Sequence, residues 1–220
     1  MTMNKTISSM RSKKGILVVV SGFSGAGKGT VMKRLLQKYD NYALSISMAT
    51  RSPRPGEVDG RDYFFVSRDA FEEKIAEGGF VEYAQYCGNY YGTPKAYVEQ
   101  QLEAGKDVIL EIEIQGALKI KEKFETALLV FVMPPSVEEL ERRLIGRGTE
   151  TPEVIRQRLS RADEEAEGIE NYDYIVINNQ LDACVEELNQ LIITAHNAPI
   201  RNKEFIQSIK EDLKQLSKGE

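Results

Sequence analysis

The sequence has very few of the side chains on which enzymes rely for thiol, imidazole or metal chemistry. Its 220 residues include one histidine, two cysteines and no tryptophan. The histidine, His196, is expected in the last turn of a helix, as a helix-end or surface residue. A structural zinc site or a catalytic cysteine–histidine pair fits this composition poorly. We therefore expect Cys87 and Cys184 to be reduced thiols in a reducing compartment, the cytoplasm.

Long apolar runs and an excess of basic charge are also missing. No apolar stretch approaches the roughly 20 residues of a membrane span, so no membrane partner is expected. Residues 1–14 are polar and basic without the apolar segment of a secretory signal. We expect a solvated tail there, although its shortage of acids also resembles an organelle transit peptide. The formal net charge is −5, so no nucleic-acid partner is expected, and phosphates must be bound by locally grouped arginines and backbone amides.

What the sequence does contain is an alternation of apolar strands and amphipathic helices. With 41% hydrophobic and 29% charged residues, the composition is that of a globular domain, and the length fits one domain with small insertions. Largely β-branched runs separated by helical patterns favour an α/β fold with a mostly parallel sheet. The strands are expected at 16–20, 108–110, 128–132 and 174–177, and helices follow residue 30 and lie near 116–123, 136–145, 152–166 and 181–196.

Residues 45–97 interrupt this alternation. They contain two aromatic-rich strands, at 63–66 and 80–86, on either side of a short helix at 68–77. Ser67 is a suitable N-cap for that helix. We interpret this stretch as a small insertion that carries one substrate.

Two further stretches are charged and helical. Residues 136–168 form a second insertion, in which Thr151-Pro152 has the form of a helix start. Residues 200–218 carry apolar side chains at steps of three and four, which predicts an amphipathic helix packed on the core or on a partner. These side chains are Ile206, Ile209, Leu213 and Leu216.

A glycine-rich segment lies directly between the first strand and the first helix. Glycines allow positive φ angles and a close approach to a ligand, so successive N–H groups can form a phosphate-binding nest at the positive end of a helix. The spacing is that of G-x-x-x-x-G-K, in which Lys28 would bind the outer phosphates of ATP. Gly29 stands where Ser or Thr is usual, so Mg²⁺ can be held mainly by phosphates and water instead of a hydroxyl. The expected ATP-binding residues are Gly22, Phe23, Ser24, Gly25, Ala26, Gly27, Lys28, Gly29 and Thr30.

A pair of arginines marks a second candidate phosphate site. Arg51 and Arg54 lie three residues apart in a non-helical segment with Pro53 and Pro55. Planar guanidinium groups suit bidentate binding of phosphate, so the pair predicts a preorganised clamp. Taken by itself, the segment also fits a solvated basic loop.

The segment from Arg51 to Phe65 resembles the guanylate kinase signature, and the resemblance covers about residues 14–197. It continues through four further motifs, Phe80-Val81-Glu82-Tyr83-Ala84, Gly88-Asn89-Tyr90-Tyr91-Gly92-Thr93, Ile112-Glu113-Ile114-Gln115-Gly116 and Gly146-Arg147-Gly148-Thr149-Glu150. Two positions depart from the pattern: Ala49 replaces the usual threonine, and Glu113 stands where aspartate is more frequent.

The resemblance implies a P-loop nucleoside-monophosphate-kinase fold with a mostly parallel sheet. It divides the chain into a core, a GMP-binding region, a helical lid and a C-terminal helical extension. The core would comprise 14–46, 98–135 and 169–197, the GMP-binding region 47–97, the lid 136–168 and the extension 198–220.

The resemblance also implies the roles of individual residues. Arg51, Arg54, Tyr63 and Tyr91 would bind the phosphate of GMP. Ser47, Glu82, Thr93 and Glu113 would read the guanine edge, whose N1–H and N2–H donors a carboxylate can accept. Lys28 and the lid arginines Arg147 and Arg158 would be the catalytic residues, and Mg²⁺ would enter with ATP, with no metal site of the protein's own.

The implied reaction transfers the terminal phosphate of ATP to GMP, possibly also to dGMP. The second pKa of a phosphate monoester is about 6, so the acceptor needs no strong base, and catalysis reduces to positioning and charge neutralisation. Two alternatives stay open. One is a non-catalytic, guanylate-kinase-like interaction module, which typically lacks an intact P-loop. The other is a kinase for another monophosphate or a small alcohol, against which Glu82 and Glu113 argue. The oligomeric state is open as well.

Overall fold

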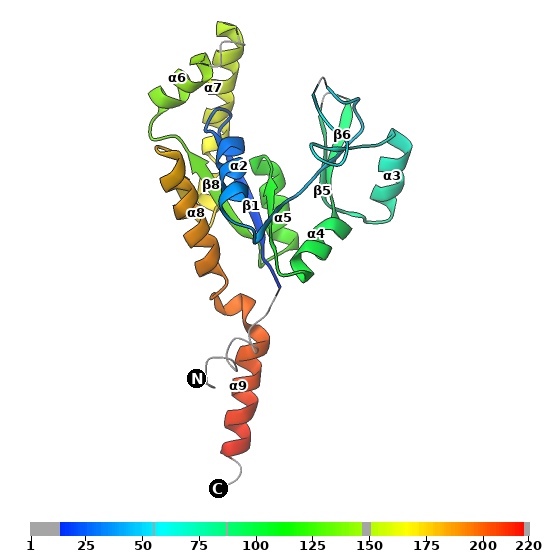
Figure 1. Cartoon of the computed structure of the whole chain (residues 1–220), viewed down its shortest axis with the longest axis vertical. Helices are drawn as coiled ribbons and strands as arrows, with labels where there is room; N and C mark the ends of the chain where they lie inside the picture. Colours follow the sequence, from blue (N-terminus) through cyan, green and yellow to red (C-terminus); the bar gives the residue numbers. More distant parts are fainter. Residues whose placement is uncertain (1–13, 55, 87, 147–150, 218–220) are drawn as a thin grey trace.

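The computed structural model describes residues 14–54, 56–86, 88–146 and 151–217. Its centre is a five-stranded sheet with the strand order β2-β7-β1-β8-β9 (Figure 1). Every pairing in this sheet is parallel, which confirms the predicted α/β fold. Its strands are β1 (Leu17–Gly22), β2 (Tyr42–Leu44), β7 (Asp107–Glu111), β8 (Leu128–Met133) and β9 (Tyr174–Ile177).

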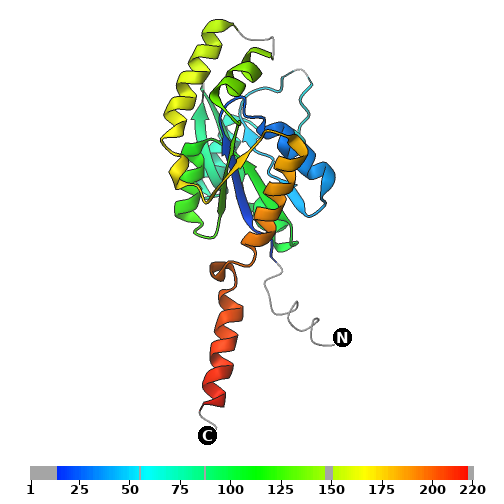
Figure 2. The same cartoon turned by 90° about the vertical axis from the view of Figure 1, so that its left-hand side faces the viewer.

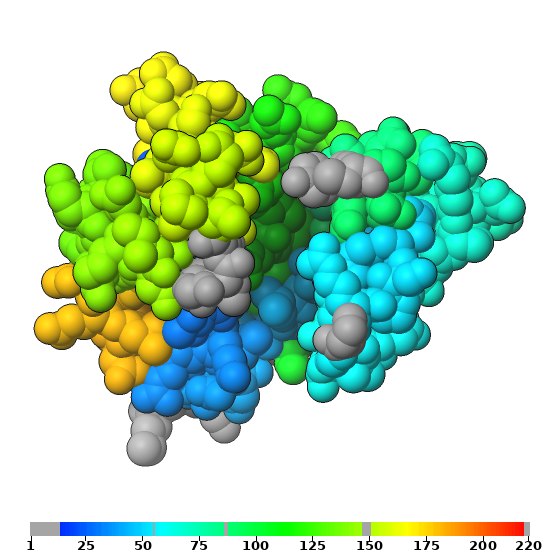
Figure 3. Space-filling view, turned by 90° about the horizontal axis from the view of Figure 1, so that it is seen from above, coloured from blue at the N-terminus to red at the C-terminus, as the bar shows by residue number. Residues whose placement is uncertain are grey.

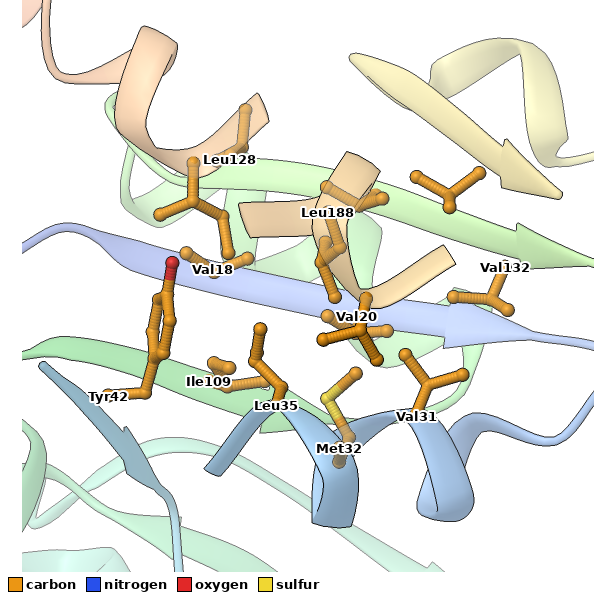
Figure 4. Close-up of a cluster of buried hydrophobic side chains, with 14 of the residues drawn as sticks. Val18, Val20, Val31, Met32, Leu35, Tyr42, Ile109, Leu128, Val132 and Leu188 are labelled. Carbon is orange, nitrogen blue, oxygen red and sulfur yellow. The ribbon is translucent and has the colours of Figure 1, made fainter. Parts of the chain in front are cut away.

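Strand β1 is the centre of the core because alternate side chains fill opposite faces of the sheet. Val18 and Val20 pack with helices α2 (Lys28–Lys38) and α8 (Leu181–Ala195) on one face (Figure 4). Val19 packs on the other face, with α4 (Lys95–Glu103) and α5 (Ile114–Lys123). All three valines are fully buried, so β1 positions the loop that follows it rigidly.

A second, four-stranded sheet lies apart from the central one, with the order β4-β3-β6-β5. Ser67 caps helix α3 by accepting a hydrogen bond from the N–H of Ala70 at 3.2 Å, as predicted. The ring of Phe71 stacks on Phe80 and Tyr90, with centroids 4.3 and 5.3 Å apart, and holds α3 on the sheet. The elements are β3 (Met48–Ala49), β4 (Phe64–Phe65), α3 (Arg68–Ala76), β5 (Phe80–Tyr86) and β6 (Asn89–Pro94).

The predicted charged helices follow β8 as α6 (Val137–Gly146) and α7 (Pro152–Ala166). Thr151 caps α7 through its hydroxyl, which accepts from the N–H of Val154 at 3.4 Å. Leu140 and Leu144 of α6 are buried against the ends of β1 and β8. Ala162 of α7 belongs to the same buried cluster, so both helices of the predicted lid contact the core. The short helices η1 (Ile169–Asn171) and η2 (Pro199–Arg201) precede β9 and the last helix.

The sequence patterns missed helix α4 and the strands β2, β3 and β6. Helix α4 has Pro94 as its N-cap residue, whose side chain offers no cap, and Val98 is its one buried residue. The strands β2 and β3 have three and two residues, which is too short for a periodic pattern to appear.

The expectation that the C-terminal helix packs on the core is wrong. Helix α9 (Lys203–Leu216) has no buried residue and points away from the central sheet (Figure 1, Figure 2). Leu213 and Leu216 are 60% and 74% exposed. Whether a partner covers this face stays a prediction.

The single histidine and the described cysteine occupy positions that stabilise the fold. His196 is the C-cap of α8, and its Nε2 lies 2.8 Å from Oδ1 of Asp107, which confirms a helix-end residue. Cys184 is buried, and burial raises the pKa of its thiol to about 11. Cys87 lies outside the described residues. Of the helices in the described part of the chain, none has both the length and the apolarity needed to cross a bilayer.

Candidate active site

The phosphate-binding loop joins β1 to α2 through two glycines in the left-handed region. Gly25 and Gly27 have φ angles of 99° and 91°. A Cβ at Gly27 would lie 2.5 Å from Nδ2 of Asn178, and one at Gly25 would lie 2.8 Å from the side chain of Leu144. Both conformation and space therefore require glycine at these positions.

Two side chains of the predicted ATP-binding set face the core. Phe23 is 8% exposed and packs edge-on against Phe131 at 5.1 Å, and Ala26 is fully buried. They anchor the loop from within and leave its backbone as the surface for a ligand. The sequence motif did not show which of its residues pack in the core and which face a ligand.

The loop is also braced from behind by two residues that the sequence patterns did not single out. The carbonyl of Ala26 accepts hydrogen bonds from Asn178 Nδ2 at 2.9 Å and from Arg143 Nη1 at 3.2 Å. Arg143 also donates to the carbonyl of Asn178 at 2.8 Å and to Glu139 at 2.7 Å. Arg143 lies in the charged helical stretch 136–168, where its sequence context gives no sign of this role. The position of Asn178, directly after the parallel strand β9, was the one available signal.

Lys28 and Arg158 both donate hydrogen bonds to the phosphate-binding loop. The ammonium of Lys28 donates to the carbonyls of Gly22 at 2.5 Å and Phe23 at 3.2 Å, so it lies across the strand end. Arg158 reaches down from α7 and donates to Oγ of Ser24 at 2.8 Å. The predicted lid arginine Arg147 lies outside the described residues.

On the acceptor side, Arg51 is held by a charged and aromatic cage. Its two terminal nitrogens donate to the carboxylate of Glu57 at 2.6 and 2.7 Å, and its guanidinium lies 4.9 Å from the ring centroid of Tyr63. This pairing raises the pKa of Arg51 and lowers the pKa of Glu57 to about 2. Glu57 is thus a structural partner that the sequence showed only as a signature residue.

The other predicted phosphate ligands differ in how close they lie to Arg51 and in their exposure. Tyr91 lies beside Tyr63, with ring centroids 6.1 Å apart, so these two rings and Arg51 form one group. The backbone N–H of Arg54 donates to Glu57 at 2.8 Å, while its side chain is exposed. The predicted clamp therefore combines a half-buried arginine with an exposed one.

Two of the predicted guanine readers form a cross-strand pair. Glu82 of β5 lies opposite Thr93 of β6, and the hydroxyl of Thr93 donates to Glu82 Oε1 at 2.8 Å. Burial raises the pKa of Glu82, although the hydrogen bond from Thr93 opposes the shift. Glu82 is thus a half-buried, oriented acceptor, not the exposed strand residue that its sequence position alone suggested.

A cleft of about 340 Å³ joins the two sides. It opens between the acceptor sheet and the P-loop and lid side of the molecule (Figure 3). Ligands of open parallel sheets bind at this end, beyond the carboxyl ends of the strands. Cavities of about 490 and 560 Å³ lie elsewhere, and both are lined by Arg201. The lining residues of the cleft are Lys28, Ser45, Ser47, Asp62, Tyr63, Glu111, Ile112 and Glu113.

Glu111 is a cleft residue that sequence reasoning missed. It is the last residue of β7, the neighbour of β1. The surrounding protein desolvates its carboxylate and raises its pKa, and Lys28 opposes this shift. A carboxylate at the end of the strand beside the P-loop strand was the available signal.

Comparison with known proteins identifies the family of this chain. The guanylate kinase family model matches residues 14–195. The chain belongs to the guanylate kinase family. It is 51% identical to a guanylate kinase of Lactococcus lactis over 84% of this chain and 90% of that relative, and 50% identical to one of Clostridioides difficile over 91% and 98%. The crystal structure of a guanylate kinase from Anaplasma phagocytophilum is 31% identical, with a TM-score of 0.69, over 87% of this chain and 92% of that one.

Family membership confirms the expected P-loop fold and enzyme class. The family match ends at residue 195, so helix α9 lies beyond it.

Proposed function

We propose that this chain transfers the γ-phosphoryl group of ATP to GMP and releases ADP and GDP. The observation that carries the proposal is the shared cleft, which is lined by Lys28 of the P-loop and by Ser47, Tyr63 and Glu113 of the acceptor side. The intact loop argues against a non-catalytic interaction module, and the names of the curated relatives agree with an enzyme.

The donor side would bind ATP through backbone N–H groups of residues 22–30 and through Lys28. Arg158 lies close enough to Ser24 to reach the transferring phosphoryl group, and Arg147 is proposed for the same task. Closure of residues 136–168 would exclude water and suppress hydrolysis of ATP.

Guanylate kinases generally use ATP together with Mg²⁺. Two hard oxygen donors that suit this ion lie near the P-loop, namely the Glu111 carboxylate in the cleft and the Thr30 hydroxyl in the first turn of α2. We propose that they would help to hold the ion, together with phosphate oxygens and water. When bound, Mg²⁺ would neutralise phosphate charge.

The acceptor side would orient GMP without a general base, because the acceptor phosphate is largely ionised at neutral pH. Arg51, Tyr63 and Tyr91 would hold the phosphate, with Arg54 reaching in from the surface. Ser47, Glu82, Thr93 and Glu113 would read guanine. Residues 47–97, 136–168 and 198–220 are accordingly proposed as acceptor region, lid and extension.

The test is ADP production with GMP, AMP, CMP or UMP as acceptor in the presence of ATP and Mg²⁺. GMP is expected to react at least 100-fold faster than the others, since a pocket built to pair with hydrogen-bonding groups strongly rejects analogues that lack them (roughly 10⁴-fold in favourable cases). Equal rates would remove the guanine assignment but leave a kinase. No turnover with any acceptor would instead favour the interaction module.

A further inference from the structure

Three charged side chains join the lid helix to the floor of the cleft. Arg161 of α7 donates from Nη2 to Oε2 of Glu113 at 3.1 Å, and its Nε lies 3.3 Å from Oε1 of Glu165. Glu113 is the N-cap residue of α5 and lines the cleft beside Lys28. One guanidinium therefore bridges two carboxylates from different elements.

The two carboxylates have different surroundings. The side chain of Glu165 is 13% exposed, whereas that of Glu113 is 68% exposed. Burial, and then the nearby Glu113 charge, raise the pKa of Glu165 to about 7, while Arg161 and Lys28 oppose the shift. Without a cation between them, two neighbouring carboxylates repel, or one takes up a proton.

The position of Glu113 matters for its proposed role. The N1–H and N2–H groups of guanine need acceptors within hydrogen-bond distance, and a carboxylate oxygen is such an acceptor. A displaced Glu113 would therefore lose part of its complementarity to GMP.

We propose that Arg161 is a positioning residue for GMP recognition, which holds the Glu113 carboxylate in place in the cleft through their ion pair and balances the charge of Glu165 beside it. This inference rests on the proposed function, because it assumes that Glu113 reads guanine. It also differs from the simpler interpretation in which Arg161 and Glu165 only form a stabilising pair on one helix.

The test compares Arg161→Met with Arg156→Met in steady-state assays. Arg156 lies on the same helix and pairs with Glu153 at the exposed surface, which makes it a matched control. For Arg161→Met we expect the KM for GMP to rise about tenfold, the loss typical of one charge-assisted contact, with kcat and the KM for ATP within threefold. The control should leave all three values within twofold.

Two further variants separate positioning from stability. Adding Glu165→Gln to Arg161→Met removes the repelling charge and should restore most of the affinity for GMP, whatever happens to Tm. Arg161→Lys keeps a cation without the two-pronged fork and should give an intermediate KM. An unchanged KM in folded Arg161→Met, or no rescue by Glu165→Gln, overturns the inference. A wild-type chain without GMP-dependent ADP production defeats the proposed function itself.

Discussion

The donor and acceptor sides of the cleft are built by different means. The P-loop is a backbone structure, anchored by buried Phe23 and Ala26 and braced at the Ala26 carbonyl. The acceptor side depends on side chains, because Glu57 and an aromatic cage hold Arg51 in place. The proposed donor site is therefore held in shape by packing, whereas the proposed acceptor site is held in shape by charge. Substitutions should affect the two sides differently.

The largest effect is expected at Lys28. Lys28→Ala should lower kcat by about 10³-fold, the order found when one preorganised charge stabiliser is removed. Its Tm should stay within about 2 °C of wild type, because the core beneath the loop does not include this side chain. ADP-release assays and thermal melts measure both. Lys33→Ala, an exposed change on the same helix, is the control. A kcat within threefold of wild type would contradict the donor role.

A substitution on the acceptor side should cost both activity and stability. Arg51→Lys loses the planar fork that matches Glu57, so the KM for GMP should rise about 30-fold and the free energy of unfolding should fall by about 1 kcal/mol. The KM for ATP should change less than twofold. Arg68→Lys, in an exposed pair with Glu72, is the matched control. If Arg51→Lys lost activity but kept full stability, charge would not be what orders the acceptor side.

The P-loop and the residues that support it differ in how far the sequence could predict them. The P-loop was predictable because one contiguous segment between a strand and a helix forms it. Its braces were not, since Asn178 and Arg143 lie 152 and 117 residues from Ala26. Local patterns carry no information about such distant hydrogen bonds.

The acceptor side and helix α9 also depend on contacts that local sequence patterns cannot predict. The spacing of two arginines indicated Arg51, and the family resemblance supplied Glu82 and Thr93, but the cage around Arg51 required the fold. The apolar spacing in α9 correctly predicted a helix. It did not show what the helix contacts, because an amphipathic pattern specifies a face but not its neighbour.

A smaller effect is expected where the two sides meet, at Glu165. Its folded pKa of about 7 lies above the ordinary value of 4.5, so the folded state takes up a proton more readily than the unfolded chain. This contribution is present below pH 4.5 and is lost as pH rises through 7.

Between pH 5 and 8, Glu165→Gln should therefore lose less stability than wild type, by about 2 kcal/mol. Urea midpoints at the two pH values measure the difference. Glu153→Gln changes an exposed carboxylate on the same helix and should follow wild type. Parallel pH profiles for wild type and Glu165→Gln would show that this carboxylate is ionised at neutral pH.

The smallest effect is expected from removing most of helix α9. Every described residue from 209 to 217 is exposed, so a chain that ends at Ser208 loses no buried contact and keeps Phe205 and Ile206, which are partly buried. It also keeps Asn202, which donates to the carbonyl of His196 at 2.8 Å. Its Tm should stay within about 1 °C of wild type, because exposed positions contribute little to stability, and both KM values should be unchanged. Melting curves and light scattering at several protein concentrations check this. A fall in both Tm and molar mass would mean that a second copy covers the helix, and that the two sides of the cleft do not stand alone.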